Sequence, residues 1–157
     1  MRTVRRRYDD VIELHNDFLR LNTPQHTKNG GQVPPAAFGT RIFATQAIQA
    51  KELGVEIITT QAAGDYSQRD RWMGYYVWPC CGYDADIPYG LRQDLRQSTL
   101  PEHLRQASMV SELIAASEGR EWWMFNGQTI HATFWIGDGS VSEEQLLSYL
   151  EEKGIRL

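Results

Sequence analysis

Long apolar runs, dispersed cysteines and closely spaced metal ligands are all missing from this chain. Cysteine occurs only twice, as the neighbours Cys80 and Cys81, and adjacent residues seldom reach the geometry of a disulfide bond. We therefore expect a reduced protein of the cytoplasm. No stretch has the apolar length of a transmembrane helix, and no apolar segment follows the charged first residues. We accordingly expect neither a membrane partner nor a signal peptide.

Metal and nucleic-acid sites also lack their usual sequence patterns. The four histidines are dispersed and show none of the short spacings of zinc ligands. The net charge of −4 gives no global reason to expect nucleic-acid binding. A cluster of arginines in the first seven residues is a local exception, which we interpret as a solvated strand face or terminus. We predict no metal site and no nucleic-acid partner.

What is present indicates one globular domain over residues 1–157. Hydrophobic residues make up 41% of the chain and charged residues 23%, which is ordinary for a soluble protein. A chain of this length buries about 70% of its unfolded surface, so one core needs no disulfide bonds. Internal repeats and low-complexity tracts are absent from the sequence.

The first half of the chain predicts a hairpin, a helix and a third strand. Alternating residues indicate strands at 3–8 and 11–21 with a bulge near Asp17. Residues 22–35 have the composition of a loop. Apolar spacing then predicts a helix that ends at Gly54, followed by a buried strand at 55–62. The apolar stripe of this helix comprises Ile42, Phe43, Ala47, Ile48, Ala50 and Leu53.

The second half predicts mainly helices. A short helix runs to about Trp78 and breaks at Pro79 before a strand that follows Gly82. A second helix begins at Pro101 and ends at Gly119, with Thr99 as its cap. Its apolar stripe comprises Leu104, Ala107, Val110, Leu113 and Ile114. Residues 122–125 either continue a helix or enter a hairpin that turns at 126–127.

A last helix is predicted from its caps. Ser142 and Gln145 have the spacing of a capping box, and Lys153–Gly154 has the composition of a helix end. The aromatic residues that precede this helix are predicted to be mostly core, and they are Trp122, Trp123, Phe125, Phe134 and Trp135.

Small residues precede the helix that follows the long loop. A helix N-terminus offers unpaired N–H groups and a partial positive charge, and a phosphate reaches them only if no side chain blocks its approach. Ala36, Ala37 and Gly39 meet part of this requirement. Taken alone, one glycine before a helix fits an ordinary strand-to-helix turn equally well.

The order of these segments resembles the GNAT superfamily of N-acetyltransferases. "PPAAFGTRIF", residues 34–43, is similar to the phosphate-binding turn of that family, with Gly39 at its final small position. "WPCCGY", residues 78–83, is similar to the aromatic-rich end of a later helix, with Gly82 and Tyr83 on its Gly-Phe pair. The resemblance covers about residues 8–88, whereas residues 89–157 diverge. It implies an α+β fold with a GNAT-like mixed, mainly antiparallel sheet flanked by helices.

The resemblance also implies a chemistry. Acetyl-CoA or another acyl-CoA would be the cosubstrate, with its pyrophosphate on the backbone N–H groups of Phe38, Gly39, Thr40 and Arg41. The pantetheine would run between two splayed parallel strands. A small-molecule or peptide amine would attack the thioester directly, and a backbone N–H of the bulged strand would hold the oxyanion.

Three positions depart from the family pattern. Pro34 stands in place of Arg or Gln, and Ala37 in place of the first glycine. Trp78 stands where the family often has a tyrosine as general acid, and an indole N–H cannot protonate a thiolate. Tyr75 or Tyr76, one helical turn or less away, is then the candidate acid.

His15 and Glu13 are the candidate bases. They alternate on one side of the predicted strand, and histidine has an unperturbed pKa of about 6.5. The structural alternatives are a strand histidine bonded to a neighbouring backbone group and a solvated carboxylate. Cys80 and Cys81 are predicted to be small buried residues rather than nucleophiles, because no activating base is placed near them by spacing.

A second function from another class fits the same residues. A non-catalytic binding or assembly module would keep the fold with a vestigial cofactor turn. Its aromatic C-terminal half would then contact another protein. Few residues precede the turn, so completion of the core by a partner is an option, and a homodimer is one form of it.

Overall fold

Four strands form one mixed sheet in the computed structural model, which describes residues 2–6, 10–16 and 38–156. Their order across the sheet is β1 (Arg2–Arg6), β2 (Ile12–Asn16), β3 (Ile57–Ala62) and β4 (Ile130–Trp135). The β2–β3 pair is parallel and the two outer pairs are antiparallel. The predicted α+β class, the hairpin and the mainly antiparallel sheet are confirmed. The predicted bulge near Asp17 and the loop at 22–35 lie outside the described residues.

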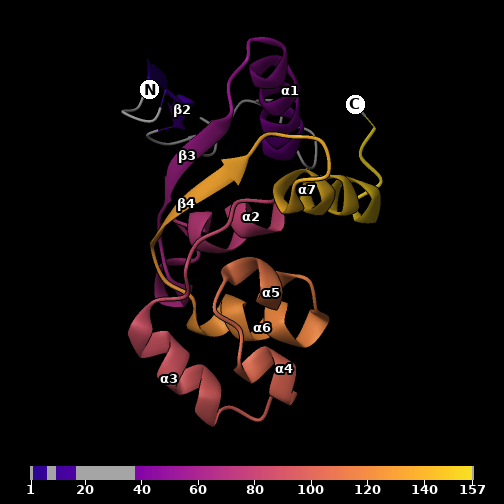
Figure 1. Cartoon of the computed structure of the whole chain (residues 1–157). Coiled ribbons are helices and arrows are strands. Elements are labelled where there is room, and N and C mark those ends of the chain that lie inside the picture. Colours follow the sequence, from indigo (N-terminus) through magenta and orange to yellow (C-terminus); the bar gives the residue numbers. More distant parts are fainter. Residues whose placement is uncertain (1, 7–9, 17–37, 157) are drawn as a thin grey trace, which may run out of the picture.

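Helix α1 (Phe38–Glu52) lies between the two parallel strands in sequence (Figure 1). It ends before Gly54, whose φ of 73° is the conformation that favours glycine at a helix end. Phe43, Ala47 and Ala50 are buried as predicted, but Ile48 is 47% exposed. Gln46 lies on the buried side instead, because its side-chain amide pairs with that of Asn16 in β2. Leu53, also predicted to be buried, follows the helix and is exposed.

Helix α2 (Gly74–Cys80) continues through Pro79, so the predicted break at this residue is wrong. Proline lacks the N–H that would bond to the carbonyl four residues earlier. That carbonyl belongs to Tyr75, and the indole Nε1 of Trp123 donates to it at 2.8 Å. A distant side chain therefore replaces the hydrogen bond that the proline removes.

The segment after α2 pairs only at single residues rather than as the predicted strand. Asp84 bridges to Thr133 of β4, and Asp86 bridges to Met109. The Asp84 carboxylate accepts hydrogen bonds from the backbone N–H and the hydroxyl of Ser111. These contacts draw the segment at 108–111 onto residues 84–87.

Four further helices follow, and they gather beneath the sheet in Figure 1. They are α3 (Tyr89–Gln97), α4 (Glu102–Arg105), α5 (Val110–Ile114) and α6 (Ser117–Asn126). The single helix predicted from Pro101 to Gly119 is wrong, because the N–H of Val110 donates to Ala85 and the Glu112 side chain caps α5. All five residues of the predicted stripe are nevertheless buried. The alternative left open at residues 122–125 resolves as helix.

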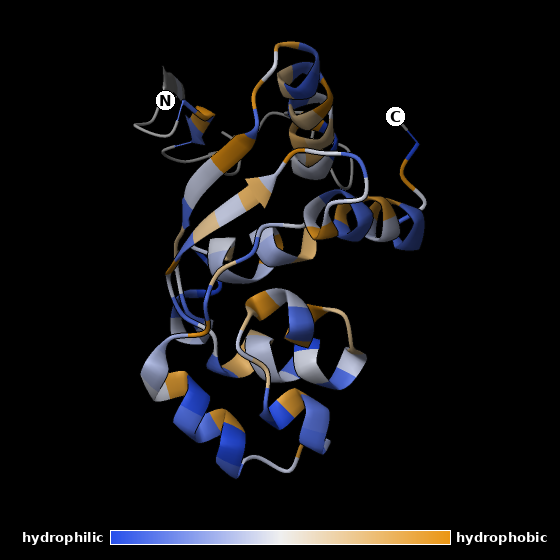
Figure 2. Ribbon diagram, in the orientation of Figure 1, coloured by the Kyte–Doolittle hydropathy of each residue, from blue (hydrophilic) through white to orange (hydrophobic). Residues whose placement is uncertain are grey.

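Exposure varies among these helices. Figure 2 shows α3 and α4 as mainly hydrophilic ribbons with isolated hydrophobic segments. Each contributes one buried leucine, Leu95 from α3 and Leu104 from α4. They therefore cover the outside of this lower layer, whereas Trp123 of α6 lies inside it.

Helix α7 (Val141–Glu152) is capped by Ser140, not by the predicted Ser142. The Ser140 hydroxyl accepts from the N–H of Glu143, whereas Ser142 is buried and its hydroxyl accepts from the N–H of Trp135. Lys153 caps the end of the helix and Gly154 follows with a φ of 62°, as predicted.

The two faces of the sheet differ in character. On the helix face, the ring of Phe43 lies edge-on to those of Phe134 and Trp78, so α1 and α2 pack on this face. Side chains alternate along a strand, and the other face carries titratable and hydroxyl groups. We call this other face the polar face, and its residues include Glu13, His15, Thr59, His131 and Trp135.

Candidate functional site

The four residues predicted to bind the cofactor form the first turn of α1. The first four N–H groups of a helix have no partner within the helix. Because α1 joins two parallel strands, it runs opposite to them, and its N-terminus lies toward the end where β2 and β3 finish. Ligands of open α/β units bind at the carboxyl ends of the strands. The geometry of the turn is thus suited to an anion.

Two side chains of this turn are engaged within the protein. The side chain of Thr40 lies beside the thiol of Cys81, and Nη1 of Arg41 donates to the carbonyl of Arg156 at 3.2 Å. Phe38 is 40% exposed. These contacts fix the turn against α2 and the C-terminal segment, so its backbone rather than its side chains is the part suited to bind a ligand.

The two candidate acids occupy different environments. Tyr75 is fully buried, and its hydroxyl donates to the carbonyl of Met124 at 2.7 Å. Burial raises its pKa. Tyr76 is half-buried, and burial followed by the nearby Cys80 thiol raises its pKa to about 12. Tyr75 is therefore part of the core, and Tyr76 is the better placed of the two.

Both cysteines are free and buried, as predicted. Burial raises the pKa of Cys80 to about 11 and that of Cys81 to about 12. A nucleophilic cysteine needs a lowered pKa, so neither thiol is activated.

The two candidate bases meet on the polar face through a residue that the sequence did not single out. The hydroxyl of Thr59 donates to Oε1 of Glu13 at 2.5 Å, and Nδ1 of His15 lies 2.8 Å from the same hydroxyl oxygen. Nδ1 of His15 lies 3.9 Å from the Glu13 carboxylate. Glu13 is only 4% exposed. The three side chains form one hydrogen-bonded chain, which we call the Glu13–Thr59–His15 chain.

Further residues of the polar face surround this chain. The ring of His131 lies 6.3 Å from that of His15. The side chain of Trp135 is 56% exposed, and β4 carries it beside Ile57. The polar face therefore combines a buried carboxylate, two imidazoles and an exposed indole.

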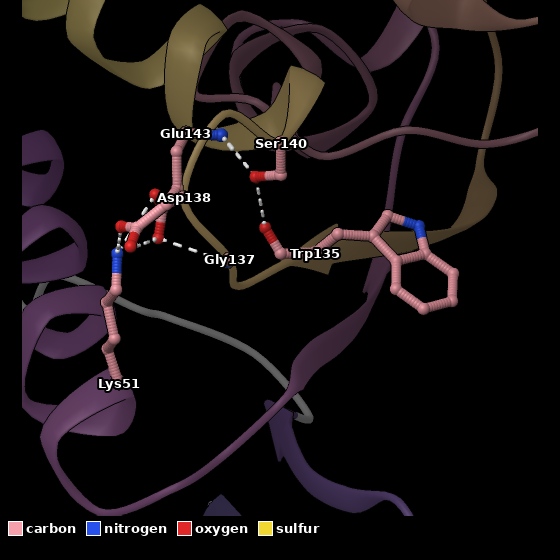
Figure 3. Close-up of polar contacts among 6 residues, drawn as sticks. All are labelled: Lys51, Trp135, Gly137, Asp138, Ser140 and Glu143. Carbon is pink, nitrogen blue, oxygen red and sulfur yellow. Dashed lines mark hydrogen bonds and ion pairs between the residues drawn. The ribbon is translucent and has the colours of Figure 1, made fainter.

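A second polar cluster holds the end of β4 in place (Figure 3). Nζ of Lys51 contacts Asp138 at 2.6 Å and Glu143 at 3.2 Å, and these contacts raise its pKa. The Ser140 hydroxyl donates to the carbonyl of Trp135 at 2.8 Å. In Figure 3 the Trp135 indole points away from this cluster. The cluster thus has a structural role, which is to join α1, the end of β4 and α7.

The sheet separates the predicted residues into two groups. Glu13 and His15 lie on the polar face, whereas Tyr75, Tyr76 and the first turn of α1 belong to the helix side. The two groups are nearest at the carboxyl ends of β2 and β3. Asn16 and Thr60 are the last residues that pair between β2 and β3, and the next two residues of β3 pair only with β4.

No protein-family model, curated protein or solved structure matches this chain. A functional assignment therefore depends on the geometry above. Within the part of the chain that the structure describes, no cluster of three His, Cys, Asp or Glu residues is suited to a metal ion. None of the described helices is both long and apolar enough to cross a membrane.

Thr59 is the functional candidate that sequence reasoning missed. Threonine is common in strands, so its presence in a predicted strand carries no signal. Its role follows from the register, which sets Thr59 opposite His15 in the parallel pair. Strand register across a crossover of this length is not encoded in local sequence.

Proposed function

We propose that this protein transfers an acyl group from an acyl-CoA, such as acetyl-CoA, to an amine, with His15 as general base. The observation that carries the proposal is the Glu13–Thr59–His15 chain near the end of β2. A base on the strand that leads to an anion-binding helix start has the placement that amine acylation needs. The GNAT-like order of strand, helix and parallel strand supports the same function.

The cofactor would approach from the helix side. Its pyrophosphate would accept hydrogen bonds from the backbone N–H groups of residues 38–41, where the helix dipole also favours an anion. Gly39 has no side chain to block the approach. The acyl group would reach the carboxyl ends of β2 and β3, and the amine would enter from the polar face.

The reaction would be a direct displacement. The amine nitrogen attacks the thioester carbonyl carbon, the C–N bond forms and the C–S bond breaks. His15 takes the proton that the amine loses. The CoA thiolate takes a proton from Tyr76 or from water, since a phenol with a pKa of about 12 retains its proton at neutral pH. A small-molecule or peptide amine is the proposed acceptor.

Calorimetry with acetyl-CoA tests the cofactor site. We expect saturable heat and a raised melting temperature. Gly39→Asp places a carboxylate where the pyrophosphate would lie, and it should weaken binding at least tenfold. A carboxylate near a helix start stabilises the helix, so the variant should fold. Thr45→Asp, on the exposed side of α1, is the matched control. No heat at millimolar acetyl-CoA with folded protein would reject the proposal.

Release of CoA in the presence of amines tests the base. His15→Gln should lower the rate about a hundredfold or more, whereas His103→Gln, on exposed α4, should leave it unchanged. Binding of acetyl-CoA without turnover of any amine would favour the non-catalytic module instead.

A further inference from the structure

Thr59 connects a buried carboxylate to an imidazole. The residue is 8% exposed and lies directly opposite His15 in the sheet. Its hydroxyl donates to Glu13 and lies within hydrogen-bond distance of Nδ1 of His15. The next residue, Thr60, faces the other side of the sheet and donates to the carbonyl of Asn16 at 2.9 Å. The two adjacent threonines therefore have different partners and different tasks.

The number of protons in the Glu13–Thr59–His15 chain fixes the direction of each hydrogen bond. A threonine hydroxyl has one proton to donate, and here it goes to Oε1 of Glu13. The contact between the hydroxyl oxygen and His15 therefore requires a proton on Nδ1. In a neutral imidazole, one nitrogen is the donor and the other is the acceptor. The lone pair of neutral His15 then belongs to Nε2.

We infer that Thr59 is a positioning residue that holds neutral His15 in the Nδ1–H tautomer, so that Nε2 is its basic atom. Its importance for catalysis rests on the proposed function, whereas its effect on the tautomer does not. Thr59 acts through His15 and does not touch the substrate. Glu13 completes the arrangement, because its carboxylate takes the Thr59 proton and so leaves the Thr59 oxygen as the acceptor that faces His15.

The choice of threonine suits this task. A β-branched side chain has restricted χ1 rotamers, and β2 and β4 pair with β3 on either side of Thr59. The hydroxyl is therefore held toward both partners. Serine retains the hydroxyl with more rotational freedom. Valine has nearly the same shape but neither donates nor accepts, so it removes the acceptor that holds the ring proton of His15 on Nδ1.

Nitrogen-15 NMR of the full chain measures the tautomer without any ligand. The His15 signals are assigned by their loss in His15→Gln and are recorded at a pH where the ring is neutral. We expect the Nδ1–H pattern in the wild type and in Thr59→Ser. Thr59→Val should shift the pattern toward Nε2–H. Thr133→Val, in the same row of the sheet on β4, is the matched control and should keep the wild-type pattern.

The same variants are then compared in acyl transfer. Loss of the partner that orients a metal-bound histidine typically costs 10–100-fold, and we use the same scale for His15. We expect a loss of that size in kcat/KM for Thr59→Val, recovery of most of the rate in Thr59→Ser, and no loss in Thr133→Val. Thermal unfolding of each variant shows whether Thr59→Val is folded, and if it is not, the His15 ring-nitrogen pattern of the wild type decides the inference.

The outcomes separate this inference from the proposed function. An Nε2–H pattern in the wild type, or an unchanged pattern in Thr59→Val, would overturn the inference. The expected tautomers together with no acyl transfer to any amine would support the inference and reject the proposed function. Full activity of Thr59→Val despite a changed tautomer would overturn the catalytic importance of Thr59.

Discussion

Asn16 and Gln46 exchange two side-chain hydrogen bonds in the buried interface between β2 and α1. Nδ2 of Asn16 donates to Oε1 of Gln46 at 3.2 Å, and Nε2 of Gln46 donates to Oδ1 of Asn16 at 3.0 Å. The second proton of the Asn16 amide goes to the hydroxyl of Tyr83 at 3.3 Å. This pair fixes α1 against the last residue of β2. It thereby sets where the helix N-terminus stands relative to the polar face.

Gln46→Leu removes both bonds and leaves a buried amide without its main partner. A buried polar group left unsatisfied costs about 1–3 kcal/mol, and we expect a loss of that size in the free energy of unfolding in urea. The control is Gln49→Leu on the exposed side of the same helix, which should change stability little. Equal effects of the two substitutions would show that the amide pair contributes nothing specific.

Gly82 is required by space and by backbone conformation together. Its φ is 97°, and a Cβ there would overlap the carbonyl oxygen of Ser142 in α7. Gly82→Ala should lower the free energy of unfolding by about 3 kcal/mol, since strained backbone and overpacking each cost 1–3 kcal/mol. Gly154 has a similar φ of 62° but open space around it. Gly154→Ala should therefore cost about 1 kcal/mol, and calorimetric melting of both variants compares them.

The first half of the fold could be predicted because its signals are local. Hydrophobic spacing and a terminal glycine define α1, and β-branched residues define β3, so the β2–α1–β3 order follows from short windows of sequence. The second half could not be predicted in the same way. Val110 and Ser111 bond to residues 85 and 84, more than 20 positions away, and these contacts separate α4 from α5 inside the one helix that was expected.

The candidate site likewise combines residues that local sequence predicts with a residue that it does not. Alternation along β2 correctly placed Glu13 and His15 on one side of the strand. The residue that connects them is on β3, 44 positions after His15. Pro79 is a comparable case, because local sequence predicts a break and only the fold brings the Trp123 indole to the Tyr75 carbonyl that the proline cannot bond.

Trp123 and Pro79 should be energetically coupled. Trp123→Phe removes the donor to the Tyr75 carbonyl, and we expect a loss of about 1–3 kcal/mol in the free energy of unfolding. Pro79→Ala supplies a backbone N–H that can bond to the same carbonyl. Pro79→Ala should therefore recover part of the lost free energy of unfolding in the Trp123→Phe background. In the wild type it should increase the free energy of unfolding by a smaller amount. A double-mutant cycle in urea measures this coupling, and additive effects would contradict it.

Stability should fall at alkaline pH because several phenol and thiol groups are harder to ionise in the folded chain. Burial raises the pKa to about 12 for Tyr76, Tyr149 and Cys81 and to about 11 for Cys80. The unfolded chain releases these protons at lower pH, from about pH 9 for the thiols. Above that pH the folded state binds more protons than the unfolded state, so raising the pH favours unfolding.

Urea unfolding between pH 7 and pH 11, under reducing conditions, measures this dependence. We expect a nearly constant free energy of unfolding up to about pH 9 and a steady decrease above it. Cys80→Ala removes one of these groups and should make the decrease shallower. A profile that stays level to pH 11 would contradict the assigned shifts.

Tyr75 and Tyr76 should separate cleanly into a structural and a functional residue. The Tyr75 hydroxyl donates to the Met124 carbonyl inside the core, so Tyr75→Phe should cost about 1 kcal/mol of stability and leave acyl transfer unchanged. Tyr76 is half-buried beside Cys80, and its hydroxyl is the candidate proton donor to the CoA thiolate. Tyr76→Phe should lower kcat with little change in the affinity for acetyl-CoA. An unchanged kcat in Tyr76→Phe would assign protonation of the thiolate to water, because Tyr75 is enclosed in the core and cannot replace it.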